Sequence, residues 1–380
     1  MKLLLLLLAS FVLSLTAACA QQPVRVQIQL HAPTLSDTTA VYITGSLGQL
    51  GDWDPAKVKM AYQGNHIWAK QIQLQQPQSF AYKYTLGSWE REATDAQAQA
   101  LPNFSVRASK DTLVKDEVRY WLEKKPAPSK GGITGTTRLH TNLTGKGIRP
   151  RDLMVWLPPG YESGRKRYQV LYMHDGQNVF DPATSSFGTD WQIDETADSL
   201  IRAGAMAPAI IVGIYNTPDR SDEYTPGEKG TAYMDFVVNT AKPFIDQAYR
   251  TRKGRKHTYT GGSSAGGIMA FMLAWEHPYV FSKAICMSPA FKIQHIDYVQ
   301  DVRGYNGKKK PLFFYIDNGG IDLEERLQPG IDDMLAALKE KGYEAGKDFI
   351  WVKDAEAKHA EAAWAKRMPF ALKSILPARK

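Results

Sequence analysis

A serine between glycines, at an expected strand-to-helix turn, is the first feature of this 380-residue chain that could do chemistry. Gly262-Ser263-Ser264-Ala265-Gly266 has the pattern G-x-S-x-G, and it lies between a strand-like run at 257–260 and a helical pattern at 268–276. In that setting the pattern predicts a nucleophile elbow, whose tight turn needs small flanking residues and lifts the serine hydroxyl above a sheet. Ser264 is therefore the candidate nucleophile of an acyl transfer.

A serine hydroxyl needs a base to take its proton, and in such folds the histidine follows the serine in the chain. Three histidines follow Ser264. His277 ends the helix that starts at the nucleophile, which places it at the wrong end, and His295 precedes any convincing acid. His359 lies in a loop between an expected strand and the last helix, and it is the candidate base.

The base in turn needs a carboxylate that holds its tautomer and stabilises the imidazolium. An expected strand at 312–316 is followed by an acidic loop that contains two glycines. Asp322, just past those glycines, is the predicted acid. Asp317, Glu324 and Glu325 are rivals for this role. Any of these carboxylates could instead be an acid that stabilises a helix N-terminus.

Acyl transfer also develops a negative charge on oxygen, which preorganised N–H donors stabilise. The backbone N–H of Ala265, directly after the nucleophile, is the first expected donor. The second should come from the loop after an early central strand, where 170–173 leads into His174-Asp175-Gly176-Gln177. Gly176 allows a sharp turn there, and the N–H of Gln177 is the second candidate.

These residues need a scaffold, and the hydrophobic pattern predicts one. Strand-like apolar runs occur at 152–157, 170–173, 209–214, 258–260, 284–287, 312–316 and 349–352. Helix-length patterns alternate with the later runs, at 191–203, 232–249, 268–276, 331–341 and 361–376. Such alternation predicts a mostly parallel sheet with helices on both faces, with its reactive groups at the carboxyl ends of the strands.

Before residue 122 the rhythm is different. Val24–Leu30, Trp68–Leu74 and Phe80–Tyr84 alternate with period two between turns rich in Gly, Asp and Pro, which predicts a small β-sandwich with Trp68 in its core. A stretch rich in Pro, Lys and Gly follows at 123–132 and reads as a linker. The expected organisation is a leader at 1–20, an all-β immunoglobulin-like sandwich at 21–121, a linker at 122–135 and an α/β domain at 136–380.

The first twenty residues have the composition of a targeting segment. A lysine, a Leu-rich stretch to residue 15 and Ala-Cys-Ala at 18–20 predict a signal peptide cleaved before Gln21, with lipid attachment at Cys19 as the alternative. No later apolar run is long enough to span a bilayer. We therefore expect a secreted or periplasmic protein, in which the remaining Cys286 is a buried thiol without a disulfide.

The net charge of +8 comes from short basic runs scattered along the chain. Runs of that length are typical of solvated loops, and they carry a slight preference for anionic substrates or surfaces. No nucleic-acid-binding motif accompanies them, so a nucleic-acid partner is not expected.

Several motifs from Thr137 to the C-terminus resemble the esterase D-like esterase family of α/β-hydrolases, which includes feruloyl and acetyl-xylan esterases, enterobactin-type siderophore esterases and S-formylglutathione hydrolases. The matching motifs are Arg151-Asp152, Leu157 to Tyr161, Leu171 to Asn178, Asp222 to Pro226, Gly262 to Gly267, Ser288-Pro289 and His359-x-Glu361-x-x-Trp364. The resemblance implies a Ser264–Asp322–His359 triad that works without metal or cofactor. It also implies that Arg220 and Glu223 line the acyl pocket, with a solvated charge pair as the alternative. Relatives usually have Gly-Thr-x-Asp/Glu in the acid loop, and this chain has Gly320 in place of the threonine.

The segment from Val41 to Pro55, with the motifs Tyr82-Lys83-Tyr84 and Ser88-Trp89-Glu90, resembles the starch-binding type of carbohydrate-binding module. That resemblance implies that Trp53 and Trp89 stack on glucose units of an α-glucan while Lys83 hydrogen-bonds to them. Indole rings suit this role because they bury the apolar face of a sugar. The alternative is a related sandwich whose tryptophans pack locally.

Together these features predict a secreted serine carboxylic ester hydrolase that removes acetyl or feruloyl groups from carbohydrate-linked esters. A siderophore trilactone esterase is the alternative among enzymes. A carbohydrate-binding protein with a silent hydrolase domain is the alternative from another class, and the complete set of serine, acid and histidine argues against it.

Overall fold

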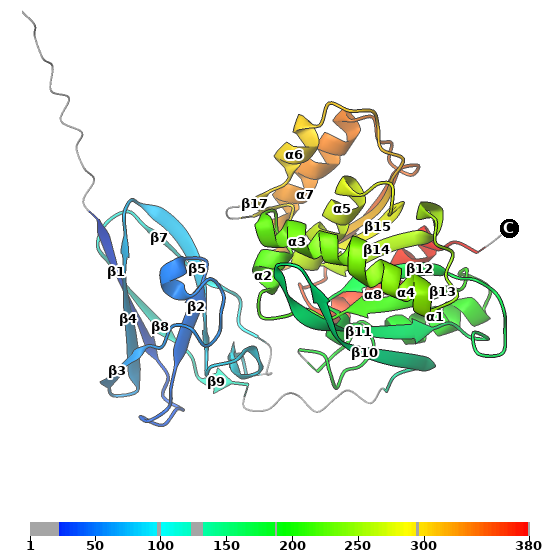
Figure 1. Cartoon of the computed structure of the whole chain (residues 1–380). Coiled ribbons are helices and arrows are strands. Elements are labelled where there is room, and N and C mark those ends of the chain that lie inside the picture. The colour runs from blue at the N-terminus through cyan, green and yellow to red at the C-terminus, as the bar shows by residue number, and fades with distance from the viewer. Residues whose placement is uncertain (1–22, 97–99, 123–131, 187, 294–295, 379–380) are drawn as a thin grey trace, which may run out of the picture. The chain divides into compact units, whose positions relative to one another are not determined.

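The computed structural model describes residues 23–96, 100–122, 132–186, 188–293 and 296–378 (Figure 1). The first of two compact units comprises the chain up to Ser88 and Glu92–Trp121, and the second comprises Trp89–Arg91 and the chain from Leu122 to the C-terminus. The expected leader at 1–20 and most of the expected linker lie outside the described residues. Among the helices that the structure describes, none is long and apolar enough to cross a membrane.

The first unit is the expected β-sandwich. A four-stranded sheet has the order β3-β4-β1-β8, a three-stranded sheet has the order β2-β5-β7, and β6 pairs with β9. The strands are β1 (Val24–His31), β2 (Tyr42–Gly45), β3 (Ala61–Gly64), β4 (Ile67–Leu74), β5 (Gln78–Thr85), β6 (Ala93–Thr94), β7 (Phe104–Ala108), β8 (Thr112–Glu117) and β9 (Tyr120–Trp121).

Alternation along β1 explains how this sandwich forms. Every second residue from Val24 to Leu30 is buried, while the residues between them face outward. Trp68 packs into the same core, as the sequence predicts, and it donates its ring N–H to the carbonyl oxygen of Thr39 at 3.2 Å. Two buried tyrosines, Tyr82 and Tyr84, both donate their hydroxyls to one carboxylate oxygen of Asp116.

The second unit is built on an eight-stranded sheet with the order β10-β11-β13-β12-β14-β15-β18-β19. The strands are β10 (Thr136–Gly145), β11 (Ile148–Leu157), β12 (Gln169–His174), β13 (Ala209–Ile214), β14 (Thr258–Ser263), β15 (Lys283–Met287), β18 (Phe313–Gly319) and β19 (Phe349–Asp354), and a small hairpin joins β16 (Lys292–Ile293) to β17 (Ile296–Asp297). All neighbours from β13 to β19 are parallel, and β11 is antiparallel to both of its neighbours. The predicted α/β-hydrolase fold is confirmed.

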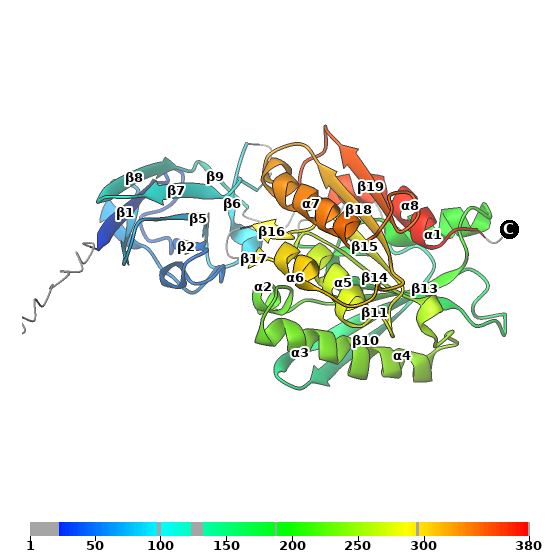
Figure 2. The ribbon, with the colours of Figure 1, turned by 90° about the horizontal axis from the view of Figure 1, so that it is seen from above.

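Helices cover both faces of this sheet (Figures 1 and 2). The helices are α1 (Ile193–Arg202), α2 (Arg220–Glu223), α3 (Glu228–Phe236), α4 (Lys242–Ala248), α5 (Ala265–Glu276), α6 (Val299–Gly304), α7 (Leu323–Glu340) and α8 (Glu361–Ile375), and a π-helical turn at Val237–Ala241 joins α3 to α4. One apolar core holds residues of α3 to α7 on one face of the sheet, and a second holds residues of α1 and α8 on the other. All six residues of β13 are buried, as expected for a strand covered on both faces.

Two elements differ from the expectation. β10 is an extra strand at the edge of the sheet, and its mostly exposed side chains leave no apolar pattern by which to predict it. α7 begins at Leu323 and not near Ile331, and it runs through Pro329 and Gly330. Gly330 is required there, because a Cβ on it would lie 2.7 Å from the carbonyl oxygen of Lys292.

Residues 133 and 134, just before β10, are already bonded to and packed against the second unit. The N–H of Thr134 donates to Asp194 at 2.6 Å, and its carbonyl oxygen accepts from the ring N–H of Trp156 at 2.7 Å. Ile133 packs against the core shared by α1 and α8.

Candidate active site

Ser264 lies at the turn between β14 and α5 with φ 57° and ψ −122°, a conformation that residues with a side chain rarely adopt. The turn has no room for neighbouring side chains. A Cβ on Gly262 would lie 2.5 Å from the carbonyl oxygen of Gly266, and one on Gly267 would lie 2.9 Å from that of Met287. The glycines are therefore required, and the serine is held in the geometry of a nucleophile elbow.

Residues with strained backbone angles lie at the carboxyl ends of the central strands. The strands β12, β14, β15 and β18 are neighbours, and Asp175, Ser264 and Ser288 follow the first three directly, with φ of 58°, 57° and 42°. Asp322, at 60°, stands between β18 and α7. Each such residue costs of order 1–3 kcal/mol, and strain of this kind clusters at functional sites. The carboxyl ends of these four strands thus mark the reactive edge that the alternating pattern predicts.

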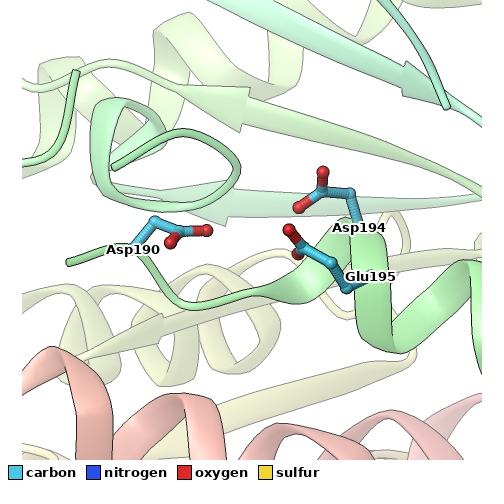
Figure 3. Close-up of side chains that lie close together, drawn as sticks. All are labelled: Asp190, Asp194 and Glu195. Atoms are coloured by element: carbon cyan, nitrogen blue, oxygen red, sulfur yellow. The ribbon is translucent and has the colours of Figure 1, made fainter. Parts of the chain in front are cut away.

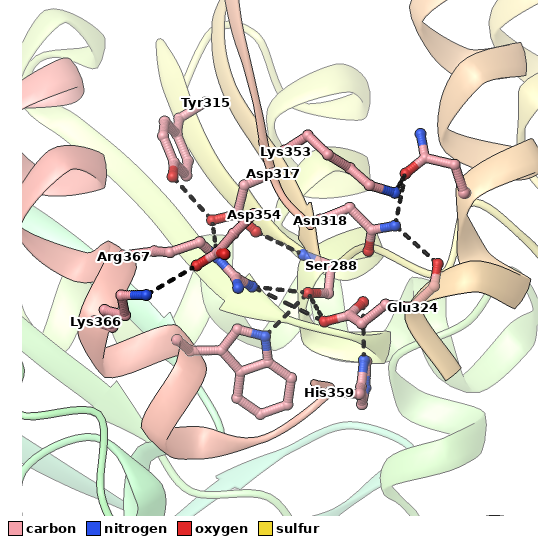
Figure 4. Close-up of polar contacts among 12 residues, drawn as sticks. Ser288, Tyr315, Asp317, Asn318, Glu324, Lys353, Asp354, His359, Lys366 and Arg367 are labelled. Carbon is pink, nitrogen blue, oxygen red and sulfur yellow. Dashed lines mark hydrogen bonds and ion pairs between the residues drawn. The ribbon is translucent and has the colours of Figure 1, made fainter. Parts of the chain in front are cut away.

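His359 faces a buried carboxylate at this edge. Its Nδ1 lies 3.3 Å from Oε2 of Glu324 (Figure 4), and neither atom has a different hydrogen-bond partner among the described residues. The hydroxyl of Ser288 donates to the other oxygen of Glu324 at 2.6 Å. Burial raises the pKa of Glu324, but His359, Ser288 and Arg367 together outweigh burial and hold that pKa below its usual range. Glu324 is therefore ionised at neutral pH.

The structure corrects the predicted acid, because Asp322 does not reach His359. Its side chain is 54% exposed, and its nearest ionic partner is Lys358 at 3.8 Å. Asp322 takes the positive φ that starts α7, which turns its carboxylate outward, while Glu324 in the first turn points into the core. Of the other rivals, Asp317 is fully buried and bonded to Arg367 at 3.0 Å, and Glu325 is exposed.

One short segment ties the serine to the acid. The N–H of Ser264 donates to the carbonyl oxygen of Met287 at 2.9 Å, and the N–H of Ala290 donates to the carbonyl oxygen of Ser264 at 3.2 Å. Between these two points, Ser288 holds Glu324. Segment 287–290 therefore bonds to the nucleophile turn on one side and to the partner of His359 on the other.

The two candidate oxyanion donors lie on elements beside this turn. Ala265 is the first residue of α5, where backbone N–H groups have no acceptor within the helix. Gln177 is the middle residue of a 3-10 turn at Gly176–Asn178, and its side-chain oxygen accepts from the N–H of Asn216 at 3.1 Å. A Cβ on Gly176 would lie 2.4 Å from the carbonyl carbon of Gly213, so the loop needs glycine to pack against β13.

Asp175 anchors that loop. Its two carboxylate oxygens accept from Nε and Nη2 of Arg220 at 2.6 and 2.8 Å, and Asn216 donates to the first of them at 2.5 Å. One of these oxygens lies 3.1 Å from where a Cβ would stand on Gly266, so the loop lies against the nucleophile turn. Arg220 was predicted as a pocket residue, and its side chain is 31% exposed.

Glu223 does not line a pocket. It is fully buried and paired with the equally buried Arg151 through contacts of 2.6 and 3.1 Å, and Thr217 donates to it at 3.2 Å. The guanidinium also lies over the ring of Tyr233, 5.0 Å from its centre. The predicted pocket role is thus wrong for Glu223, and so is the alternative of a solvated pair, because both charges are enclosed.

His174, which precedes Asp175, is a buried residue without a predicted role. Its Nδ1 lies 2.8 Å from the hydroxyl of Tyr233, and its Nε2 lies 3.2 Å from that of Thr260. Burial lowers the pKa of His174 to about 3, so it is neutral. As the last residue of the buried strand β12, it anchors the start of the loop that carries Gln177.

The other histidines that follow Ser264, and the cysteine, remain to be placed. His277 ends α5, and its Nδ1 lies 2.9 Å from the hydroxyl of Tyr279. His295 lies outside the described residues. Cys286 is a buried free thiol, as predicted, and burial raises its pKa well above the usual value.

Three carboxylates gather near the start of α1 and could hold a cation. Oxygens of Asp190, Asp194 and Glu195 lie within 4.8 Å of one another (Figure 3). Burial raises the pKa of Asp194 to about 8, and its contact with Glu195 contributes to that rise.

The candidate sugar residues are less exposed than the resemblance implies. Trp53 is half-buried with φ 66°, an unusual conformation for a bulky side chain, and its N–H donates to the carbonyl oxygen of Gly45. Trp89 is half-buried in a 3-10 turn at Trp89–Arg91. Lys83 is bound at 2.6 Å to the buried carboxylate of Glu92, so its charge is already paired within the sandwich.

Both units of the protein match the sequence models of known families. A family model described as "Putative esterase" matches residues 148–379, and one described as "Starch binding domain" matches residues 23–114. The topology of the sheet and the serine at the turn after β14 are those of the α/β-hydrolase fold. The chain belongs to the family of the first model, whose match covers more than half of it, and its N-terminal sandwich matches the starch-binding domain.

Solved structures share the fold at low sequence identity. A ferulic acid esterase is 20% identical with a TM-score of 0.51, over 64% of this chain and 99% of that chain. The enterobactin esterase FES from Shigella flexneri, solved with 2,3-di-hydroxy-N-benzoyl-serine, is 13% identical with a TM-score of 0.53, over 93% of this chain and 94% of that chain.

A curated relative matches only in part. The uncharacterized protein YbbA of Bacillus subtilis (strain 168) is 23% identical over 154 residues, which are 37% of this chain. The match spans 57% of that relative's length.

Proposed function

We propose that this protein is a secreted serine esterase that uses Ser264, His359 and Glu324 to remove acyl groups from carbohydrate-linked esters. The observation that carries the proposal is the pairing of His359 with the buried, ionised Glu324 at the same sheet edge as the strained Ser264. A histidine fixed by a carboxylate through Nδ1 keeps Nε2 free to act as a base toward a serine.

The chemistry follows from these positions. Ser264 Oγ attacks the acyl carbon while His359 Nε2 takes the hydroxyl proton, and Glu324 stabilises the imidazolium. The N–H groups of Ala265 and Gln177 stabilise the oxyanion. The ester C–O bond then breaks, and His359 returns the proton to the leaving alcohol. Water, deprotonated by the same histidine, then attacks the acyl-serine. The bond between the acyl carbon and Ser264 Oγ breaks, and His359 returns the proton to Oγ, which releases the acid and the free serine.

The sandwich supports the carbohydrate part of the proposal. Residues 23–114 match the starch-binding domain model, and Trp53 has the strained backbone that often accompanies a binding role. An appended sugar-binding module would raise the local concentration of ester groups on a polysaccharide near the catalytic unit. The leader predicted at 1–20 would deliver the enzyme to the compartment where such polymers occur.

A siderophore trilactone is the second candidate substrate. The likeness to the enterobactin esterase FES extends over 93% of this chain and includes the region of the sandwich, whereas that to the ferulic acid esterase covers 64%. The net charge of +8 also favours an anionic catecholate over a neutral sugar.

A substrate panel separates these candidates. The purified protein is assayed with acetylated and feruloylated oligosaccharides and with a catecholate trilactone, each beside the Ser264→Ala variant. We expect the highest kcat/KM with a sugar ester. A preference for the trilactone would move the function to siderophore release. Equal, background rates for wild type and Ser264→Ala on every ester would leave a carbohydrate-binding protein with a silent hydrolase domain.

A further inference from the structure

The hydroxyl of Ser288 behind the candidate acid has a complete set of partners. It donates to Oε1 of Glu324 at 2.6 Å. It accepts from the ring N–H of Trp364 and from Nη2 of Arg367, each at 3.1 Å (Figure 4). All four side chains are buried.

These three partners allow the O–H bond of Ser288 to point in one direction only. A serine hydroxyl has one proton and two lone pairs. Trp364 Nε1 and Arg367 Nη2 can only donate, so they occupy both lone pairs. The proton must then point at Glu324, and donation to a carboxylate gains from the positive charge of the arginine behind the serine. Ser288 therefore acts as a donor with a fixed orientation.

The supports of Ser288 are themselves fixed. Arg367 Nε donates to Asp317 Oδ2 at 3.0 Å, and the hydroxyl of Tyr315 donates to the same oxygen at 2.9 Å. The N–H of Ser288 donates to the other oxygen of Asp317 at 3.1 Å. Ser288 also holds a strained φ of 42°, which its buried bonds stabilise. The network thus joins β15, β18, α7 and α8 behind a single carboxylate.

We propose that Ser288 is a positioning residue for catalysis, which orients Glu324 and through it the Nδ1–H tautomer of His359. This inference rests on the proposed function, in which Glu324 and His359 belong to the catalytic triad. The two carboxylate oxygens of Glu324 have three neighbours. Oε2 faces His359, while Oε1 accepts from Ser288 and lies 3.9 Å from Nη2 of Arg367. Without the serine proton, the carboxylate can rotate toward Arg367 and leave the imidazole.

The test compares Ser288→Ala with Ser282→Ala in the full-length protein. Ser282 is the matched control, because its hydroxyl is also buried in the second unit but has no hydrogen-bond partner among the described residues. We expect kcat for a nitrophenyl ester to fall about ten- to a hundredfold in Ser288→Ala with little change in KM, by analogy with outer partners of metal-bound histidines. Ser282→Ala should keep the wild-type kcat.

A spectroscopic readout separates positioning from folding. In the folded protein at low pH, the proton NMR signal of His359 Nδ1–H should lie far downfield in wild type and Ser282→Ala, and it should move upfield in Ser288→Ala. If Ser288→Ala fails to fold, Trp364→Phe serves instead, since it removes one donor to Ser288 and keeps a ring beside His359. Its kcat should fall by a smaller factor in the same direction.

The possible failures are distinguishable. If Ser264→Ala abolishes turnover while Ser288→Ala, or Trp364→Phe in its place, matches the control in kcat and in the His359 signal, the positioning role is wrong and the esterase proposal stands. If Ser264→Ala keeps wild-type turnover, the esterase proposal itself is wrong.

Discussion

The two units hold their candidate functional side chains in different ways. In the second unit, the carboxylate that faces His359 is fully buried, and each of its oxygens has a partner. Among the candidate sugar residues, Trp53 of the first unit and Trp89 are half-buried, and the cation of Lys83 is paired with Glu92. Both units contain strained non-glycine residues, but only in the second do they line up on neighbouring strands.

This difference corresponds to two kinds of function. An acyl transfer needs groups whose direction and protonation are fixed before the substrate arrives, so enclosure and paired hydrogen bonds are an advantage. A sugar platform needs apolar faces that remain accessible, so few fixed partners are required. Substitutions in the second unit should therefore have effects of orders of magnitude, and those in the first should change binding by small factors.

The largest expected effect is the loss of turnover on replacing the nucleophile or the base. Ser264→Ala and His359→Ala should each lower kcat for nitrophenyl acetate by about a million-fold, as in other serine triads. The double variant should be no worse than either one, because the residues act as a unit. Near wild-type turnover in Ser264→Ala would remove the basis for regarding the second unit as catalytic.

Glu324→Gln should have the next largest effect, and Asp322→Asn, two residues earlier at an exposed site, is its matched control. We expect Glu324→Gln to lower kcat by about 10⁴-fold, because an amide holds the wrong imidazole tautomer. Asp322→Asn should be close to wild type. The reverse outcome would restore Asp322 as the acid and contradict the geometry of the structure.

The variant Glu324→Gln should also change how the stability of the fold depends on pH. The pKa of folded Glu324 lies below its unfolded value, so its ionisation stabilises the fold above the usual pKa of about 4.3. That contribution is lost as the pH falls through the lowered folded pKa. The gap in Tm between wild type and Glu324→Gln should therefore be present at neutral pH and close in acid.

Glu223→Gln tests the enclosed ion pair of the second unit. Because the guanidinium of Arg151 would be left buried without its counter-charge, we expect a loss of about 3–5 kcal/mol in the free energy of unfolding. Urea denaturation of the isolated variant would measure it, with Glu162→Gln as control, since Glu162 pairs with Arg138 on the surface. A loss as small as that of the control would mean that the pair is open to solvent.

The smallest expected effect belongs to the sandwich. Trp53→Ala and Trp89→Ala should each weaken retention on starch in affinity electrophoresis, by about fivefold if stacking contributes about 1 kcal/mol. Tyr120→Ala is the control, because this tyrosine is an exposed aromatic of the same unit. Equal mobility of the wild type in gels with and without starch would show that the sandwich serves another purpose.

Much of the fold was predictable because its strands carry continuous or alternating apolar runs. The strand predicted at 209–214 coincides with β13, and that at 349–352 lies inside β19. The edge strand β10 was missed because most of its side chains are exposed and leave no regular apolar pattern. The start of helix α7 was predicted eight residues too late, because Pro329 and Gly330 are residues that usually interrupt a helix.

The missed start of α7 also explains the wrong acid. With the helix taken to begin after Gly330, the segment around Asp322 was read as a loop in which any carboxylate could reach the histidine. Extended backward at helical spacing, the buried face of α7 runs from Ile331 through Leu327 to Glu324. An acidic residue on that apolar face is the signal that could have identified Glu324 from the sequence. The pairing of Lys83 with Glu92 had no such signal, because the turns between them decide whether the two residues meet.

The edge strand β10 bears on how the protein behaves at high concentration. An exposed strand offers a row of free peptide groups that a second chain can extend, which is how many β-rich proteins aggregate. Here the pairing of β10 with β11 shifts register twice, between His140 and Leu143 and again before Gly145, and Arg138 adds a charge to the rim. Such bulges twist a strand out of line. Concentrated solutions of the enzyme should therefore resist the edge-to-edge stacking that leads to fibrils.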